Sequence, residues 1–270
     1  MTISPADFMG SAPAPLGGNT AWASRYAGEI RRMITAYSER RPRSLQLHLG
    51  PSELGVACDR QVAGKMAGLP KTNHVSDPWP SFVGTAIHAE MENVLHWYNR
   101  VNNVMRFVAE QRVTPHPNHP GTADGYDAVE QCVLDWKALG ESTMNKVRRA
   151  EGPPRKYVVQ LLLYGHGYRL MGLPVKRVVL AALPRTSSSL DGVHVWERPH
   201  TPADDELLAL VFQQTEHRQQ LAIALHSGQI SLLDIDAAPS YDECYFCPFY
   251  RPESARDGLQ GCPGNLKNAQ

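Results

Sequence analysis

The chain has 270 residues, of which 42% are hydrophobic and 20% are charged, and its 27 basic and 27 acidic side chains give a formal net charge of zero. It is long enough for one large domain or two small ones. A neutral chain has no overall field that attracts nucleic acid or an anionic membrane, so any such partner must be held by a local patch. The longest apolar runs fall far short of the roughly 20 residues of a membrane span. The N-terminus lacks the basic start and apolar core of a secretory signal, so we expect a cytoplasmic protein with no membrane partner.

Residues 1–20 are rich in proline, glycine, serine and alanine, and this composition predicts a flexible tail. Apolar residues then recur at helical spacing, and Trp22 and Tyr26 begin one such stripe. Three helices are expected in this part of the chain: 21–40, a short helix that Ser52 caps and that carries Cys58, and 81–100.

After residue 103 the apolar pattern changes to one that is typical of strands. Strands are expected at 104–113, 122–128, 131–138, 175–183 and 192–198. Between the third and fourth strands we expect a basic loop (144–156) and a helix (157–171), and a long helix follows the last strand (203–226). This order predicts an α/β (α+β mixed) fold, with a central mixed sheet flanked by helices, in a single domain over 21–270.

Asp135 and Lys137 are the first candidates for chemistry. Alternate side chains of a strand share a face, so these two point one way while Leu134 and Trp136 point the other way, into a core. A carboxylate and an ammonium presented together can bind a divalent metal and steady a water or phosphate beside it. The alternative is a surface ion pair on a half-exposed strand.

Asp124 belongs to the strand before. If the two strands form a hairpin that turns at Val129 and Glu130, Asp124 lies opposite Asp135, with their Cβ atoms about 5 Å apart. Two carboxylates that close repel each other unless a cation lies between them. The alternative is that Asp124 is a turn residue before Gly125.

Two further features lie on predicted helices. Gln160 and Tyr164 are four positions apart and share a helix face. Gln can orient water or a phosphate oxygen, and Tyr can donate to a phosphate or stack on a base. His88 lies at the edge of the apolar stripe of its helix. The alternative for Gln160 and Tyr164 is a pair on the helix surface. The alternative for His88 is a core histidine whose hydrogen bonds are satisfied within the protein.

The five cysteines do not form the dense framework of a small secreted protein, which favours a reducing compartment. Cys244 and Cys247 form a CxxC pair, and thiolates in this arrangement select zinc or an iron–sulfur cluster. Cys262 offers a third ligand, and Cys58 is a better fourth candidate than Cys132, which we expect to be a buried small hydrophobe. The alternative is a set of reduced thiols without a metal.

Taken in order, His88, Asp124, Asp135-x-Lys137 and Gln160-x-x-x-Tyr164 resemble the RecB-type branch of the PD-(D/E)XK nuclease superfamily. The four cysteines that bracket them, Cys58, Cys244, Cys247 and Cys262, make the chain similar to the iron–sulfur exonucleases of that branch. These include the nuclease domain of the AddB helicase subunit and the CRISPR-associated exonucleases with four cysteines. The resemblance spans roughly residues 50 to 265 and implies a restriction-endonuclease-like core.

The resemblance also implies roles for these residues. His88, Asp124, Asp135 and the backbone carbonyl of Trp136 are expected to bind a catalytic Mg²⁺ or Mn²⁺. Lys137 is expected to position the attacking water and stabilise charge on the phosphate. Gln160 and Tyr164 are expected to support the site or to contact DNA. The four cysteines are expected to hold a [4Fe–4S] cluster that ties the C-terminal segment to the N-terminal helix.

The resemblance therefore implies a metal-dependent DNA exonuclease that hydrolyses phosphodiester bonds in recombination, repair or DNA end processing. DNA, as single strands or duplex ends, is the expected partner, and a second copy of the chain or a helicase is a further candidate. A basic stretch around residues 146–156 and another around 31–43 could follow the DNA backbone, and the alternative for both is a solvated face. Two other functions stay open: a non-catalytic DNA-binding or assembly module with the same fold, and a zinc-binding module.

Overall fold

The structure is a computed structural model that describes residues 21–40, 49–73, 77–238, 241–252 and 261–264. The predicted flexible tail, residues 1–20, lies outside the described residues. Contacts within the chain group residues 1–45 as one compact unit and residues 46–270 as another. No described helix is both long enough and apolar enough to cross a membrane.

The first unit contains α1 (Ala21–Glu39), which matches the helix expected at 21–40. The rings of Trp22 and Tyr26, which begin its apolar stripe, stack with their centroids 5.0 Å apart. Because this helix belongs to the unit of residues 1–45, the single domain expected over 21–270 stays a prediction.

The second unit is built on a five-stranded sheet in the order β1-β2-β3-β4-β5. Its strands are β1 (Phe107–Val113), β2 (Gly121–Asp127), β3 (Cys132–Leu139), β4 (Arg177–Pro184) and β5 (His194–Pro199). β3 and β4 run parallel, whereas the other neighbours are antiparallel. The predicted mixed sheet flanked by helices is therefore confirmed, in a mixed α/β fold.

The parallel pair β3–β4 needs a crossover connection, which α5 (Glu141–Val147) and α6 (Arg155–Leu170) provide. The prediction of a basic loop at 144–156 was wrong for the first part of that range, because α5 extends into it. Met144 and Val147 lie three positions apart on this short helix and are both buried, so one face of α5 packs on the core.

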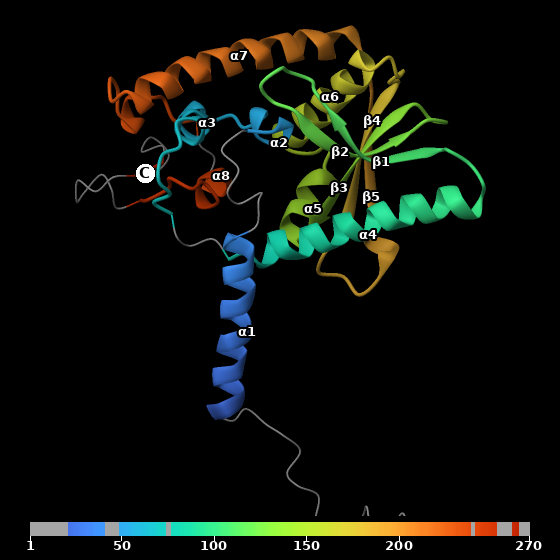
Figure 1. The fold of residues 1–270 in the computed structure, drawn as a ribbon, viewed down its shortest axis with the longest axis horizontal. Coiled ribbons are helices and arrows are strands. Elements are labelled where there is room, and N and C mark those ends of the chain that lie inside the picture. Colours follow the sequence, from blue (N-terminus) through green and yellow to red (C-terminus); the bar gives the residue numbers. More distant parts are fainter. Residues whose placement is uncertain (1–20, 41–48, 74–76, 239–240, 253–260, 265–270) are drawn as a thin grey trace, which may run out of the picture. The chain divides into compact units, whose positions relative to one another are not determined.

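Helices cover both faces of the sheet (Figure 1). α4 (Trp79–Val101) packs on one face, where its Leu95 belongs to a cluster with Trp136 of β3 and Ala181 of β4. α6 packs on the other face, in the main core. Side chains on both faces of β3 therefore pack against other parts of the protein. Leu134 and Trp136 point into a core, as predicted.

The single helix expected after Ser52 is two helices, α2 (Pro51–Leu54) and α3 (Asp59–Met66). Ser52 lies inside α2 rather than capping it, and Cys58 occupies the N-cap of α3. The break falls at Gly55, where an added Cβ would lie 2.8 Å from the Cα of Lys156 in α6. The chain turns there because only glycine lets the two backbones approach so closely.

The remaining helices bring the end of the chain to α3. α7 (Pro202–His226) packs on α3, and the other helical elements described here are α8 (Tyr241–Tyr245) and two short 3-10 turns, η2 (Leu190–Gly192) and η3 (Leu232–Asp234). Arg218 of α7 is fully buried and donates to the carbonyls of Leu54 and Val56 at 3.0 and 2.6 Å. It also donates to Asp59 Oδ1 at 2.7 Å, so α7 fixes the turn that carries Cys58.

Candidate functional site

The β2–β3 hairpin has the register that the sequence predicted. Gly125 pairs with Leu134, and the next pair in this register is Asp124 with Asp135. The paired ladder ends before that position. There the backbone N–H of Trp136 donates to Asp124 Oδ2 at 2.8 Å instead. The two strands therefore separate at Asp124, and its carboxylate lies where they part.

Asp127 explains how Val129 and Glu130 can form the turn of this hairpin. Its Oδ1 accepts hydrogen bonds from the backbone N–H groups of Val129 and Glu130, at 3.0 and 3.2 Å. Arg106 donates to both carboxylate oxygens of Asp127, at 2.7 to 3.1 Å. Burial opposes ionisation of Asp127, but the Arg106 and backbone hydrogen bonds outweigh it and lower its pKa below the ordinary value.

Glu110 is a residue of the site that sequence reasoning missed. The constant β1–β2 register places it across from Asp124, so Glu110, Asp124 and Asp135 follow one another across three strands. Glu110 has a φ of 46°, in the left-handed region that few side chains adopt. It is the one acidic residue of β1, and that is the sequence signal that points to it.

A three-ligand group forms where α4 approaches these strands. His88, Glu110 and Asp124 each offer a ligand atom, and these atoms all lie within 4.8 Å of one another. His88 Nδ1 lies 3.2 Å from Asp124 Oδ1. Burial lowers the pKa of His88, but the hydrogen bond and charge of Asp124 outweigh it and raise the pKa above its usual value. An imidazole and two carboxylates form a donor set that divalent cations accept.

Asp135 and Lys137 form the adjacent part of the site. Asp135 is 1% exposed, and Lys137 Nζ lies 2.6 Å from its Oδ2. Burial raises the pKa of Asp135 and the nearby Asp124 raises it further, while the charge of Lys137 opposes both. Asp135 Oδ1 has no hydrogen-bond partner within the described part of the chain. The ammonium of Lys137 also lies 5.3 Å from the ring centroid of Tyr157 in α6.

Gln160 and Tyr164 lie together on α6 as predicted, and both are buried. Gln160 Nε2 donates to Tyr164 Oη at 3.2 Å. The Tyr164 ring packs against Gly121, where an added Cβ would lie 3.2 Å from its Cε1. The pair is therefore not on the helix surface, and its role toward phosphate or DNA stays a prediction, as does metal binding by the carbonyl of Trp136.

Two residues of the basic stretch at 146–156 have structural partners. Arg148 donates to the carbonyl of Gly192 at 2.7 Å, and Arg155 donates to that of Gly55 at 3.1 Å. Lys156 Nζ lies 5.7 Å from the ring centroid of Tyr157, on the helix that carries Gln160. In the N-terminal stretch, positions 41 and 43 lie outside the described residues.

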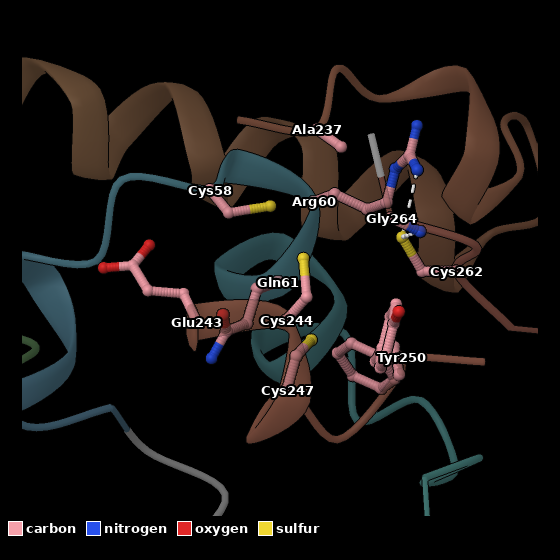
Figure 2. A pocket seen from close by; sticks show the side chains of 11 residues that line it. Cys58, Arg60, Gln61, Ala237, Glu243, Cys244, Cys247, Tyr250, Cys262 and Gly264 are labelled. Carbon is pink, nitrogen blue, oxygen red and sulfur yellow. Dashed lines mark hydrogen bonds between the residues drawn. The ribbon is translucent and has the colours of Figure 1, made fainter. Parts of the chain in front are cut away.

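Four cysteines line one pocket in the second unit: Cys58, Cys244, Cys247 and Cys262. Figure 2 shows their sulfur atoms around a common space, with Cys58 at the start of α3 and Cys244 on α8. Burial raises the pKa of the Cys244 and Cys247 thiols to about 11. Metal binding at this pocket would therefore release protons, because the ligand is the thiolate.

Cys132 lies apart from that pocket, at the start of β3, and is 4% exposed. Burial raises the pKa of its thiol to about 11. The prediction that it is a buried small residue is confirmed. Cys58 lines the pocket and Cys132 is not among its lining residues, whereas the role of Cys58 as a ligand stays a prediction.

No family model and no curated protein matches the chain. Three solved structures to which it is similar have low sequence identity. An alkaline exonuclease (LHK-Exo) from Laribacter hongkongensis has 10% identity and a TM-score of 0.45, covering 68% of this chain and 91% of that one. The protein SSO0001 has 15% identity and a TM-score of 0.45, covering 88% and 98%. A phage related exonuclease from Haemophilus somnus 129PT has 12% identity and a TM-score of 0.38, covering 68% and 96%.

Proposed function

We propose that this chain is a divalent-metal-dependent deoxyribonuclease, an exonuclease of the RecB-type PD-(D/E)XK class. One observation carries the proposal: Glu110, Asp124 and Asp135 lie in register across three strands, at the point where β2 and β3 separate. His88 approaches these carboxylates from α4, and Lys137 lies beside Asp135. A surface ion pair does not account for the arrangement, because Asp124 and Asp135 are both buried.

Phosphodiester hydrolysis needs an activated water and compensation for the charge that develops on the phosphate. A bound Mg²⁺ or Mn²⁺ supplies a Lewis acid and lowers the pKa of water. His88, Asp124 and Asp135 would hold it, together with the carbonyl of Trp136, and Glu110 adds a carboxylate. The fit rests on Asp135, whose buried Oδ1 has no hydrogen-bond partner among the described residues. A cation satisfies an orphaned buried carboxylate oxygen.

Lys137 supplies a fixed positive charge in this site. Its side chain is 16% exposed, so solvent screens the ammonium only weakly. We propose that it stabilises charge on the phosphate and positions the attacking water. Its 2.6 Å contact with Asp135 Oδ2 supports this role, because it holds the ammonium beside the metal-binding carboxylate. Gln160 and Tyr164 would support the site from α6, and DNA is the proposed partner.

We also propose that Cys58, Cys244, Cys247 and Cys262 hold a [4Fe–4S] cluster. Their position around one pocket supports a shared ligand. A CxxC pair with two further thiolates is a donor set that an iron–sulfur cluster or zinc accepts, and the iron content and colour of the protein distinguish the two.

The experiment compares two buried aspartates of the same strand, Asp124 and Asp127. Anaerobically purified wild type, Asp124→Asn and Asp127→Asn are incubated with end-labelled single- and double-stranded DNA, with Mg²⁺, Mn²⁺ or EDTA. Wild type and Asp127→Asn should cleave when a metal is present. Asp124→Asn should fold but not cleave, because it lacks a ligand of the hydrolytic metal.

Two results would contradict the proposal. One is cleavage by Asp124→Asn within about threefold of wild type, because loss of a ligand to a hydrolytic metal should cost far more. The other is cleavage that persists in EDTA. DNA binding without cleavage in every condition would favour the non-catalytic binding module.

A further inference from the structure

A buried arginine and a backbone N–H both donate to the sulfur of Cys262 in the pocket. Arg60 Nη1 donates to Cys262 Sγ at 3.0 Å, and the backbone N–H of Gly264 donates to it at 3.4 Å (Figure 2). Arg60 lies on α3, the helix that Cys58 caps. The guanidinium therefore reaches from the helix of one cysteine to the sulfur of another.

The other nitrogens of Arg60 are also fixed. Nε donates to the carbonyl of Ile235 at 2.8 Å, and Nη2 donates to that of Leu233 at 3.2 Å. Three nitrogens of the planar guanidinium thus have separate acceptors, and the side chain is held in one orientation. Arg60 is 9% exposed, so this orientation is enforced from inside the protein.

The charge of Arg60 has no carboxylate partner within 4.0 Å in the described part of the chain. A buried arginine is normally paired, because a charge is costly to remove from water. The anion that the pocket offers is the thiolate of Cys262. A cysteine that ligates a metal does so as the thiolate, so a bound cluster presents Arg60 with a negatively charged sulfur.

We propose that Arg60 is a positioning residue of the cysteine site, which donates a charge-assisted hydrogen bond to the ligating sulfur of Cys262 and thereby sets the reduction potential of the cluster. The inference rests on the proposed [4Fe–4S] cluster and adds a role that the four ligands do not supply. Hydrogen bonds to the sulfurs and nearby charge both tune such potentials. A donor and a positive charge stabilise the more electron-rich reduced form, so Arg60 makes the cluster easier to reduce.

Lys65 offers a matched control on the same helix. Its ammonium lies near Cys247 but pairs with Glu53 Oε1 at 2.5 Å. Replacing Lys65 by Met removes one positive charge from this side of the pocket, as Arg60→Met does. The two variants therefore separate the effect of a hydrogen bond to sulfur from that of charge alone.

The test is an anaerobic redox titration of wild type, Arg60→Met, Arg60→Lys and Lys65→Met, full length, with dithionite and mediator dyes. The charge-transfer absorbance of the cluster is followed, and iron is measured for each protein. We expect Arg60→Met to be harder to reduce, with its reduced-to-oxidised ratio at a given potential at least tenfold lower, a shift of about 59 mV for one electron. Arg60→Lys should lie between, and Lys65→Met should shift by less than a third as much.

The outcomes separate this inference from the proposed cluster. Wild type without iron overturns the cluster, and the role of Arg60 with it. Iron in wild type with equal potentials in all four proteins overturns the Arg60 role alone, and so does an equal shift in Lys65→Met. If Arg60→Met loses iron during purification while Lys65→Met retains it, that loss supports the positioning of Cys262, and Arg60→Lys then gives the potential. An Arg60→Lys potential equal to that of wild type would overturn the role in that case.

Discussion

Two aspartates of β2, Asp124 and Asp127, have different hydrogen-bond partners. Asp127 closes the β2–β3 turn and pairs with Arg106, whereas Asp124, three positions earlier, faces His88 and the N–H of Trp136. Both oxygens of the Asp127 carboxylate accept hydrogen bonds from Arg106 or the turn backbone. The Asp124 carboxylate lies between Glu110 and Asp135, where β2 and β3 separate. Partners, rather than residue type, distinguish a structural carboxylate from one that can take a metal.

Asp127→Asn should lower the free energy of unfolding by about 1–3 kcal/mol at pH 7, because a buried, charge-assisted hydrogen-bond network loses its charge. The pKa of Asp127 is lowered in the folded state by Arg106 and backbone donors, against burial. Its stabilisation is therefore present above the ordinary Asp pKa of about 3.9 and is lost as the pH falls through the folded-state value. Urea unfolding at pH 7 and at pH 3 measures the difference. A difference between wild type and variant that stays constant across this range would refute the assignment.

Glu110 combines a proposed metal-binding role with a strained backbone conformation. A non-glycine residue with φ of 46° has a conformation that costs about 1–2 kcal/mol, and Asn adopts it more readily than Glu. Glu110→Asn should therefore raise the free energy of unfolding by about 0.5–1 kcal/mol. The same substitution should weaken Mn²⁺ binding about tenfold or more, because the shorter amide supplies no charge at the site. Calorimetry and thermal unfolding measure the two effects, with Gln111→Ala as the neighbouring control. Lower stability together with unchanged Mn²⁺ affinity would contradict both expectations.

The sequence predicted Asp124 and Asp135 as a pair because the hairpin is local, and its register depends only on where the chain turns. Glu110 was beyond this reasoning for two physical reasons. Its strand joins β2 through a long connection that does not fix a register. Its left-handed φ is set by the surrounding structure rather than by local preference. Gln160 and Tyr164 were correctly placed on one helix face, but sequence spacing does not show that both are buried.

Among the secondary-structure elements, α3 shows how a helix can be adapted to a neighbouring segment. An added Cβ at Gly64 would lie 2.7 Å from Cε2 of Phe249, a buried ring of the segment between Cys247 and Cys262. The absence of a side chain at this position lets the cysteine-bearing end of the chain lie directly on α3. Gly84 in α4 has open space around it, with no neighbouring atom within 4 Å of an added Cβ.

The same substitution should therefore have opposite effects in the two helices. Gly84→Ala should stabilise the protein by about 0.8–1 kcal/mol, the difference in helix propensity. Gly64→Ala gains the same propensity but must displace Phe249, which costs about 1–3 kcal/mol, so we expect a net loss of stability. Denaturant unfolding of the two variants measures both signs, and stabilisation by Gly64→Ala would show that α3 and Phe249 are not in tight contact.

Elements with a clear apolar period were predicted with nearly correct bounds, as the long helices and the β2–β3 hairpin show. α5 was missed because only two of its seven residues, Met144 and Val147, face the core, within a basic stretch. The split between α2 and α3 was missed because it follows from close packing of Gly55 on α6. Both errors concern tertiary contacts that overrule a short local pattern.

At the scale of the whole molecule, the cysteine pocket joins distant parts of the chain. Cys58 and Cys244 are 186 positions apart, yet both line it, and α7 holds the turn before Cys58 through the buried Arg218. The fold class was predictable from the order of helices and strands. The contact of α3 with the C-terminal segment was predictable only through the cysteines, because the apolar pattern of short segments does not specify their partners.

A metal that closes so large a loop should determine the stability of the unit around it, because binding free energy at a site absent from the unfolded chain is folding free energy. Cys58→Ala, Cys244→Ala, Cys247→Ala and Cys262→Ala should each give colourless protein with a much lower unfolding midpoint and weak nuclease activity. Cys132→Ala should retain the brown colour and lose about 1 kcal/mol of stability, because it removes one small buried group outside the pocket. Visible absorbance, iron content and denaturant unfolding under nitrogen measure these effects. A bleached Cys132→Ala beside a brown Cys58→Ala would show that the fourth ligand is misassigned, and stoichiometric zinc without iron would refute the cluster itself.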